Sequence, residues 1–349
     1  MADNPFSNRT EFGIQNDALR YTWAAYNIFI LLSSFIGDTT ILVASIKYRA
    51  LKVHKLIVVI VQQIAVCDLL MSAVFVFPRV VSLIVNKWVF GDTLGYIMAY
   101  GNYYFTTAGL LLIAAMTTTK LFILKYPIRA KFLSSQRSQM ICVAMWILAL
   151  IIPVIKVVVQ KEDVRFDFRL YGCQFDLSAN IWSWLKPTLA CLFILLPIII
   201  VVVTSVNIVM IAKRFTRPKG DKLKLKRRGE ANLKLKKEGV ITTILVVIFY
   251  CISILPYMIY VIIYPSIIDN PHSFFTTHYN RLVASFTLIN TISNFYIYSM
   301  TVASFREFLW SSRLNMLRHC TRQPEVVCFS TQGSEGNCTG ELNLKLFYR

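Results

Sequence analysis

The chain has 349 residues, of which 56% are hydrophobic and only 16% are charged, and its mean hydropathy is +0.56. A soluble domain of this length cannot bury so much apolar side chain, so a soluble protein is excluded. The net charge of +19 suggests nucleic-acid binding, but the basic residues gather in short segments between long apolar runs, as in the cytoplasmic loops of membrane proteins.

The first 21 residues are polar and of mixed charge, without the apolar centre of a cleavable signal peptide. The first apolar run is therefore expected to act as its own insertion signal. Asn8-Arg9-Thr10 is a glycosylation acceptor, so Asn8 is a candidate glycosylation site if this tail lies outside.

Seven apolar runs follow, each long enough to cross a hydrocarbon core of about 30 Å. They are expected at 22–46, 56–85, 94–124, 140–159, 182–211, 240–264 and 281–303. Basic segments follow the first, third and fifth runs, whereas 160–179 is expected to be a loop without basic excess. This asymmetry predicts an outside tail and inside basic loops. The most basic segment, 213–237, is either an amphipathic extension on anionic lipid or a solvated loop.

The sequence thus predicts an all-α membrane protein with a seven-transmembrane helix bundle at 22–303. An extracellular tail (1–21) precedes the bundle, and a short amphipathic eighth helix (304–318) and a cytoplasmic tail (319–349) follow it. Cys320, directly after the eighth helix, is either palmitoylated or an unmodified tail cysteine.

Short motifs inside these runs resemble those of the rhodopsin-like G-protein-coupled receptors, in the same order, over residues 22–318. Gly37-Asp38 looks like that family's Gly-Asn, 64–69 like its Leu-Ala-x-x-Asp-Leu, and the run 294–298 like its Asn-Pro-x-x-Tyr. Further matches are Trp88-x-Phe90-Gly91, Trp146, Pro197, Pro256-Tyr257 and Phe305-Arg306. The resemblance implies a receptor in the plasma membrane that binds an extracellular ligand and signals to a heterotrimeric G protein.

Four departures from the family pattern stand out. Thr119-Lys120-Leu121 occupies the place of Asp-Arg-Tyr, Ile254 that of the sixth-run tryptophan, Phe295 that of the last proline, and Gly95 that of the third-run cysteine. Only Cys173 falls in an expected outer loop. The family's outer disulfide is therefore expected to be missing, with Cys173 a free thiol or an intermolecular link.

Asn290, Asn294 and Tyr298 recur at helical spacing and form a polar stripe along the last run. At bilayer depth such a stripe must face other helices or enclosed water. Asp38 and Asp68 are its expected partners. Two neighbouring carboxylates in a low dielectric cannot both stay ionised cheaply. They are expected to share a proton, to hold a cation such as sodium with Asn290 and Asn294, or to form a protonated structural pair.

The switch residues implied by the resemblance are Thr119, Lys120, Leu121, Lys236 and Tyr298. In the family an arginine at the position of Lys120 pairs with an acid on the sixth run, but that acid's position is Lys236 here, with Glu238 close by in the chain. Two lysines repel, and lysine lacks the planar fork of arginine. Either raised basal activity or loss of coupling is expected; alternatively, Lys120 simply snorkels to the inner surface.

The ligand pocket is expected between the outer halves of the second, third, fifth, sixth and seventh runs. Its candidate lining residues are Arg79, Asn102, Tyr103, Thr106, Tyr257, Tyr260 and Ser285. Arg79, Lys156 and Lys186 favour an anionic or peptide ligand, unless they snorkel at the interface. In the family, an acid at the position of Asn102 suggests an amine ligand, and a lysine at the position of Leu288 suggests retinal. Neither residue is present here, which disfavours an amine ligand and an opsin.

No catalytic triad, paired-cysteine metal pattern or phosphate loop is apparent, so the chain is not expected to be an enzyme. Two alternatives to a signalling receptor stay open. One is a seven-span partner of another receptor that no longer couples to a G protein. The other is a proton or cation transporter or channel that uses Asp38 and Asp68.

Overall fold

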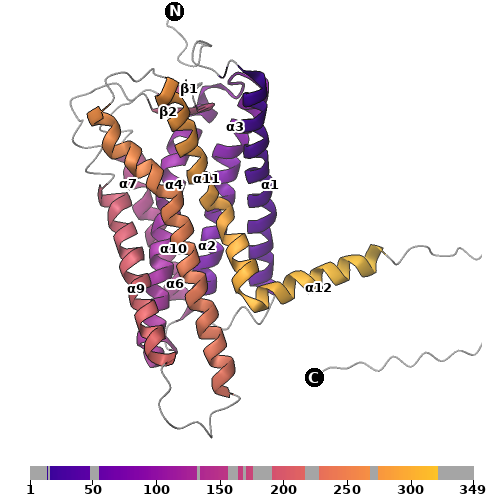
Figure 1. The fold of residues 1–349 in the computed structure, drawn as a ribbon, viewed down its shortest axis with the longest axis vertical. Coiled ribbons are helices and arrows are strands. Elements are labelled where there is room, and N and C mark those ends of the chain that lie inside the picture. Colours follow the sequence, from indigo (N-terminus) through magenta and orange to yellow (C-terminus); the bar gives the residue numbers. More distant parts are fainter. Residues whose placement is uncertain are drawn as a thin grey trace, which may run out of the picture. The chain divides into compact units, whose positions relative to one another are not determined.

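The computed structural model describes residues 14, 16–47, 55–131, 134–155, 164–167, 170–175, 191–216, 228–267 and 274–320. Long helices lie alongside one another (Figure 1). The helices within the described ranges are α1 (Asp17–Lys47), α2 (Lys55–Met71), α3 (Phe77–Val85), α4 (Gly91–Lys125), α5 (Pro127–Lys131), α6 (Ser135–Ala149), α7 (Ile151–Ile155), α9 (Leu196–Thr216), α10 (Arg228–Ile267), α11 (Phe274–Thr301) and α12 (Ala303–Cys320).

Six helical segments within the described ranges are long and apolar enough to cross a membrane. They are Asp17–Lys47, Leu56–Val85, Gly91–Lys125, Ser135–Ile155, Leu192–Ile211 and Glu238–Pro256. The 28-residue α11 is more polar, yet Ser285, Thr291, Ser293 and Asn294 on it are all buried. Because neighbouring helices cover these polar groups, α11 takes its place as the seventh helix of the bundle at little cost.

Two π-helical turns interrupt the bundle helices just before prolines. The turn η3 (Ser72–Val76) joins α2 to α3 ahead of Pro78, and η5 (Cys191–Leu195) leads into α9 ahead of Pro197. A proline lacks an N–H group and its ring clashes with the carbonyl four residues earlier. The wider π turn, which contains that carbonyl in both cases, relieves the clash without breaking the span.

Gly37 lets α1 and α11 approach closely. A Cβ atom at Gly37 would lie 2.7 Å from Cβ and 2.8 Å from Cγ of Phe295. The glycine on α1 therefore leaves the space that the aromatic ring on α11 fills. Phe295 also contacts Phe305 on α12, and the centroids of the two rings are 6.1 Å apart.

The segment 160–179, expected to be a loop, instead contains a β-hairpin. Strands β1 (Val164–Asp167) and β2 (Gly172–Phe175) pair antiparallel, with Val164 opposite Phe175. The hairpin lies at the end of the bundle where α1 begins (Figure 1). We call this end the hairpin side. Tyr171 in the turn anchors it there: its Oη donates to Asn86 Oδ1 at 2.8 Å and accepts from the Ile14 N–H at 3.2 Å.

Cys173 on β2 is a free thiol, as expected from the absence of a partner at Gly95. Its backbone N–H points to Met98 Sδ on α4 at 3.4 Å, so the hairpin contacts α4 without a covalent bond. The thiol is 2% exposed, and burial raises its pKa to about 12. A covered, protonated thiol is a poor nucleophile, which favours the free thiol over the intermolecular link.

Candidate functional site

The polar centre of the bundle brings together α1, α2 and α11. Asp38, Asp68 and Asn294 are 1%, 4% and 2% exposed. Asn294 Nδ2 donates to Asp68 Oδ2 at 3.0 Å, joining α11 to α2. The expected meeting of the acids with the asparagine stripe is therefore present for Asp68 and Asn294.

Asp38 has a different partner, which the sequence analysis missed. Ser34 Oγ donates to Asp38 Oδ2 at 2.7 Å, and Ser72 Oγ in η3 donates to Ser34 Oγ at 2.7 Å. The two carboxyl groups interact electrostatically, but no hydrogen bond joins them in the described bundle, so a proton shared directly between them is not what the structure contains. Among the described residues Asp38 Oδ1 is buried without a partner, which leaves one acceptor open for a cation, a proton or a water.

The signal for Ser34 was available in the sequence. It lies one helical turn before Asp38, where a hydroxyl on the same helix face can reach the carboxyl group. Ser72 could not have been found in this way, because its contact depends on how α1 and the π turn pack together.

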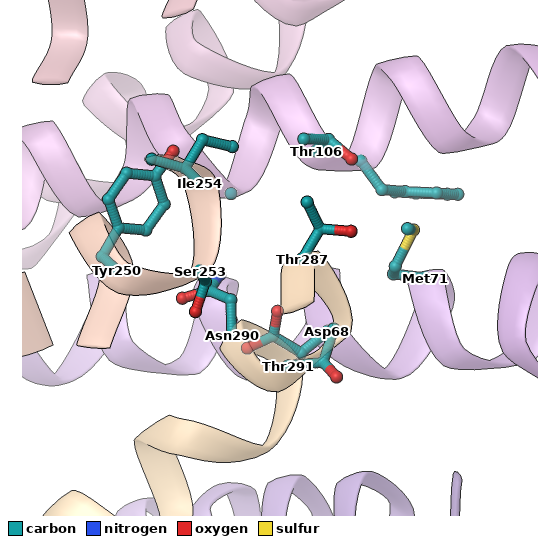
Figure 2. A pocket seen from close by; sticks show the side chains of 11 residues that line it. Asp68, Met71, Thr106, Tyr250, Ser253, Ile254, Thr287, Asn290 and Thr291 are labelled. Carbon is teal, nitrogen blue, oxygen red and sulfur yellow. The ribbon is translucent and has the colours of Figure 1, made fainter. Parts of the chain in front are cut away.

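A cavity of about 40 Å³ lies beside Asp68. Its walls are Asp68, Met71, Phe105, Thr106, Gly109, Tyr250, Ser253, Ile254, Thr287, Asn290 and Thr291. Figure 2 shows Asp68, Asn290 and Thr291 gathered at one side of it. This volume holds about two or three water molecules. Asn290 thus shares the cavity with Asp68, although Asn294 makes the hydrogen bond.

Tyr250 is a wall residue that the sequence analysis did not single out. Its side chain is 3% exposed, and its Oη is buried without a hydrogen-bond partner within the described ranges. With Asp68 it gives the cavity a donor and an acceptor of fixed position. Water or a small hydrated ion fits such a space better than an apolar group does.

The seven candidate ligand-binding residues do not share one pocket in the described structure. Thr106 lines the cavity, Asn102 and Tyr103 are half-buried on α4, and Arg79 is buried on α3. Ser285 Oγ donates to the Arg281 carbonyl of its own helix at 2.7 Å, so it does not offer that proton to a ligand. Tyr257 and Tyr260 lie on α10, but their side chains are outside the described part.

At the other end of the bundle, Lys120 binds α10 through a neutral group. Its Nζ donates to Thr243 Oγ1 at 3.1 Å. The Lys236 side chain lies outside the described part of α10, so its expected repulsion of Lys120 stays a prediction. Glu238, which is close to Lys236 in the chain, accepts from the Ala303 N–H at 3.4 Å.

The remaining switch candidates lie on α4 beside Lys120 and on α11. Tyr298 is 8% exposed and its Oη points to Met116 Sδ on α4 at 3.8 Å. Thr119 and Leu121 are half-buried on α4. Thr242, which the sequence analysis did not single out, donates to Thr301 Oγ1 at 2.8 Å and so ties α10 to the end of α11.

Two predicted modification sites cannot be placed. Asn8 lies outside the described residues, and Cys320 is the last residue of α12, with its side chain outside the described part.

Comparison with known proteins agrees with this arrangement. The family described as 7 transmembrane receptor (rhodopsin family) matches residues 37–298, from the glycine of the first motif to the tyrosine of the last. The crystal structure of squid rhodopsin is similar, with a TM-score of 0.75 and 18% sequence identity over 93% of this chain and 95% of that chain. At this identity the match shows a shared fold.

Proposed function

The chain belongs to the rhodopsin family of seven-transmembrane receptors, and we propose that it binds an extracellular ligand and passes the signal to a heterotrimeric G protein by rearranging its helices. The observation that carries the proposal is the hydrogen bond from Lys120 to Thr243. It joins α4 to α10 at the position where the family resemblance puts the switch. A single hydrogen bond between the two helices is a restraint that ligand binding can break.

In the proposed orientation the N-terminal tail and the hairpin face outward from the plasma membrane, and the basic loops face the cytoplasm. The ligand enters from the hairpin side, where Arg79, Asn102, Tyr103, Tyr257, Tyr260 and Ser285 are candidate contacts, and it is a peptide or an anion. In the same orientation Asn8 is available for glycosylation, and Cys320 is on the cytoplasmic side, where palmitoylation takes place.

The proposal is tested by nucleotide exchange on a G protein in membranes that contain the chain. We expect ligand-independent exchange above that of membranes without it, because Lys120 has no acidic partner in the described bundle. Lys236→Glu supplies an acid at the position the family uses and is expected to lower this exchange about threefold or more, as a new charged pair would. Exchange indistinguishable from empty membranes with a panel of G proteins would count against coupling.

We further propose that Asp38 and Asp68 belong to one site that takes up a proton or a cation, with Asn290 and Asn294 as neighbours. The support is the buried Asp38 Oδ1 without a partner and the cavity at Asp68. In this role the site modulates the receptor; ion flux through vesicles containing the chain would instead support transport.

Asp38→Asn is expected to abolish the sodium and pH dependence of basal nucleotide exchange. The variant keeps an oxygen that accepts from Ser34 Oγ but cannot carry the charge. Asp92→Asn, which changes an exposed carboxylate in the first turn of α4, is the matched control and should leave both dependences intact. If they persist in Asp38→Asn, the acid is a protonated structural group.

A further inference from the structure

Polar atoms without partners gather where α1 packs against α3. Within the described part of the chain, Trp23 Nε1, Asn27 Oδ1, Arg79 Nε, Arg79 Nη1 and Ser82 Oγ are all buried and make no hydrogen bond. Asn27 and Ser82 are 0% exposed and Arg79 is 2% exposed. Proteins rarely leave buried polar groups unpaired, and an unpaired buried charge is the costliest case. Several such groups in one interface indicate a partner that the described residues do not supply.

Two hydrogen bonds fix how α1 lies against this part of the chain. Ser72 Oγ donates to Ser34 Oγ at 2.7 Å towards the middle of the bundle, and Arg20 Nη1 donates to the Leu83 carbonyl at 2.9 Å near the hairpin side. The two segments run antiparallel between these points. Arg79 lies between them, so its guanidinium is held inside the packed interface and does not snorkel to the membrane surface.

A third helix, α11, closes the same region. Tyr26 Oη on α1 donates to the Ser285 carbonyl on α11 at 2.9 Å. Arg79 interacts electrostatically with Tyr26 and with Arg281, which is 4% exposed. Asp167 on the hairpin in turn interacts with Arg281. Arg281 thus has a carboxylate near it, whereas no carboxylate of the described residues pairs with Arg79.

The surroundings of Arg79 are otherwise apolar. Its guanidinium lies over the Phe75 ring, 6.0 Å from the centroid. Phe75 belongs to a cluster of buried side chains that includes Ile30, Val80 and Leu288, one from each of the helices around it. In such surroundings a positive charge binds an anion more strongly than it would in water.

We propose that the interface of α1, α3 and α11 binds the carboxylate of an otherwise apolar ligand, with Arg79 as the anchoring residue. A carboxylate carries a negative charge opposite Arg79, and its planar oxygens match the guanidinium fork. Trp23 Nε1 and Ser82 Oγ supply two further donors, and the apolar side chains contact the rest of the ligand. The inference rests on the proposed function and narrows its ligand to one chemical class.

The test is thermal unfolding of the purified full chain with hexanoate and, as the matched neutral probe, hexanamide. We expect hexanoate to raise the unfolding temperature in a concentration-dependent manner and hexanamide to leave it unchanged, because only the anion binds the native state selectively. N-acetyl-leucyl-phenylalanine and its carboxamide form a second pair. A response to the peptide acid alone identifies a peptide terminus as the source, and a response to hexanoate identifies a small acid.

Arg79→Gln is expected to weaken the hexanoate response about tenfold or more, the loss usual for a hydrogen-bonded charge pair. Arg129→Gln, an exposed arginine near the other end of the bundle, is the matched control and should keep the full response. Arg79→Met guards against a folding defect. Without any probe it should unfold at or above the wild-type temperature, because an unpaired buried cation is replaced by an apolar chain.

Equal shifts with hexanoate and hexanamide, or a full hexanoate response in Arg79→Gln, would overturn the site. So would an unfolding temperature that no probe changes, the result expected if water alone fills the interface. Nucleotide exchange measured on the same samples separates this inference from the proposed function. Binding without exchange under any condition removes the coupling and keeps the site, whereas exchange without binding removes the site alone.

Discussion

Gly37→Ala is expected to lower the thermal unfolding temperature of the purified chain by roughly 5 °C, since overpacking of this kind costs about 1–3 kcal/mol. The new methyl group would lie 2.7 Å from Phe295 Cβ and 2.8 Å from its Cγ, closer than real Cβ contacts allow. Neither atom belongs to the flexible end of a side chain. The helices α1 and α11 must therefore move apart.

Gly239→Ala is the matched control for this prediction. Gly239 lies on α10, and a Cβ added there meets nothing within 4 Å. Alanine is the better helix former by about 1 kcal/mol, so this variant should unfold at the same temperature or above. If Gly37→Ala is as stable as Gly239→Ala, the close approach of α1 to Phe295 is not part of the native structure.

The contact between Gly37 and Phe295 illustrates what a sequence can and cannot predict here. Both residues were singled out, one as a motif match and the other as a departure from a motif, but nothing in the sequence said that they touch. Bilayer-length apolar runs are a one-dimensional signal, so the helices could be located. Which residues of two helices meet depends on their rotation and register, which no local pattern encodes.

The candidate site shows the same limit. The pairing of Asp68 with Asn294 followed from the rule that polar groups inside a membrane must face each other. Asp38, by contrast, takes Ser34 on its own helix and Ser72 on a π turn as partners. The hairpin was missed because each strand has only four residues. It is held by tertiary contacts such as Tyr171 to Asn86 rather than by strand propensity.

Thr243→Val is expected to raise basal nucleotide exchange on the G protein several-fold. Thr243 is 1% exposed, and its Oγ1 accepts from Lys120 Nζ at 3.1 Å while donating to the Gly239 carbonyl at 2.8 Å. Valine has nearly the same shape, so packing is kept and the acceptor is removed. A hydrogen bond to a charged group contributes about 1.5–3 kcal/mol. Its loss can shift a two-state equilibrium about tenfold or more towards the form in which α4 and α10 separate.

The other links of α10 survive this substitution, which makes the result interpretable. Thr242 still binds Thr301 at the end of α11, and Glu238 still accepts from Ala303 at the start of α12, so α10 keeps both contacts. Thr118→Val is the matched control, because the Thr118 hydroxyl is bonded to the Ala114 carbonyl of its own helix and joins no second helix. Basal exchange that rises equally in both variants, or in neither, would show that the bond between Lys120 and Thr243 does not restrain α10. A rise in Thr243→Val alone means that one neutral hydroxyl performs the restraint for which an acid was expected.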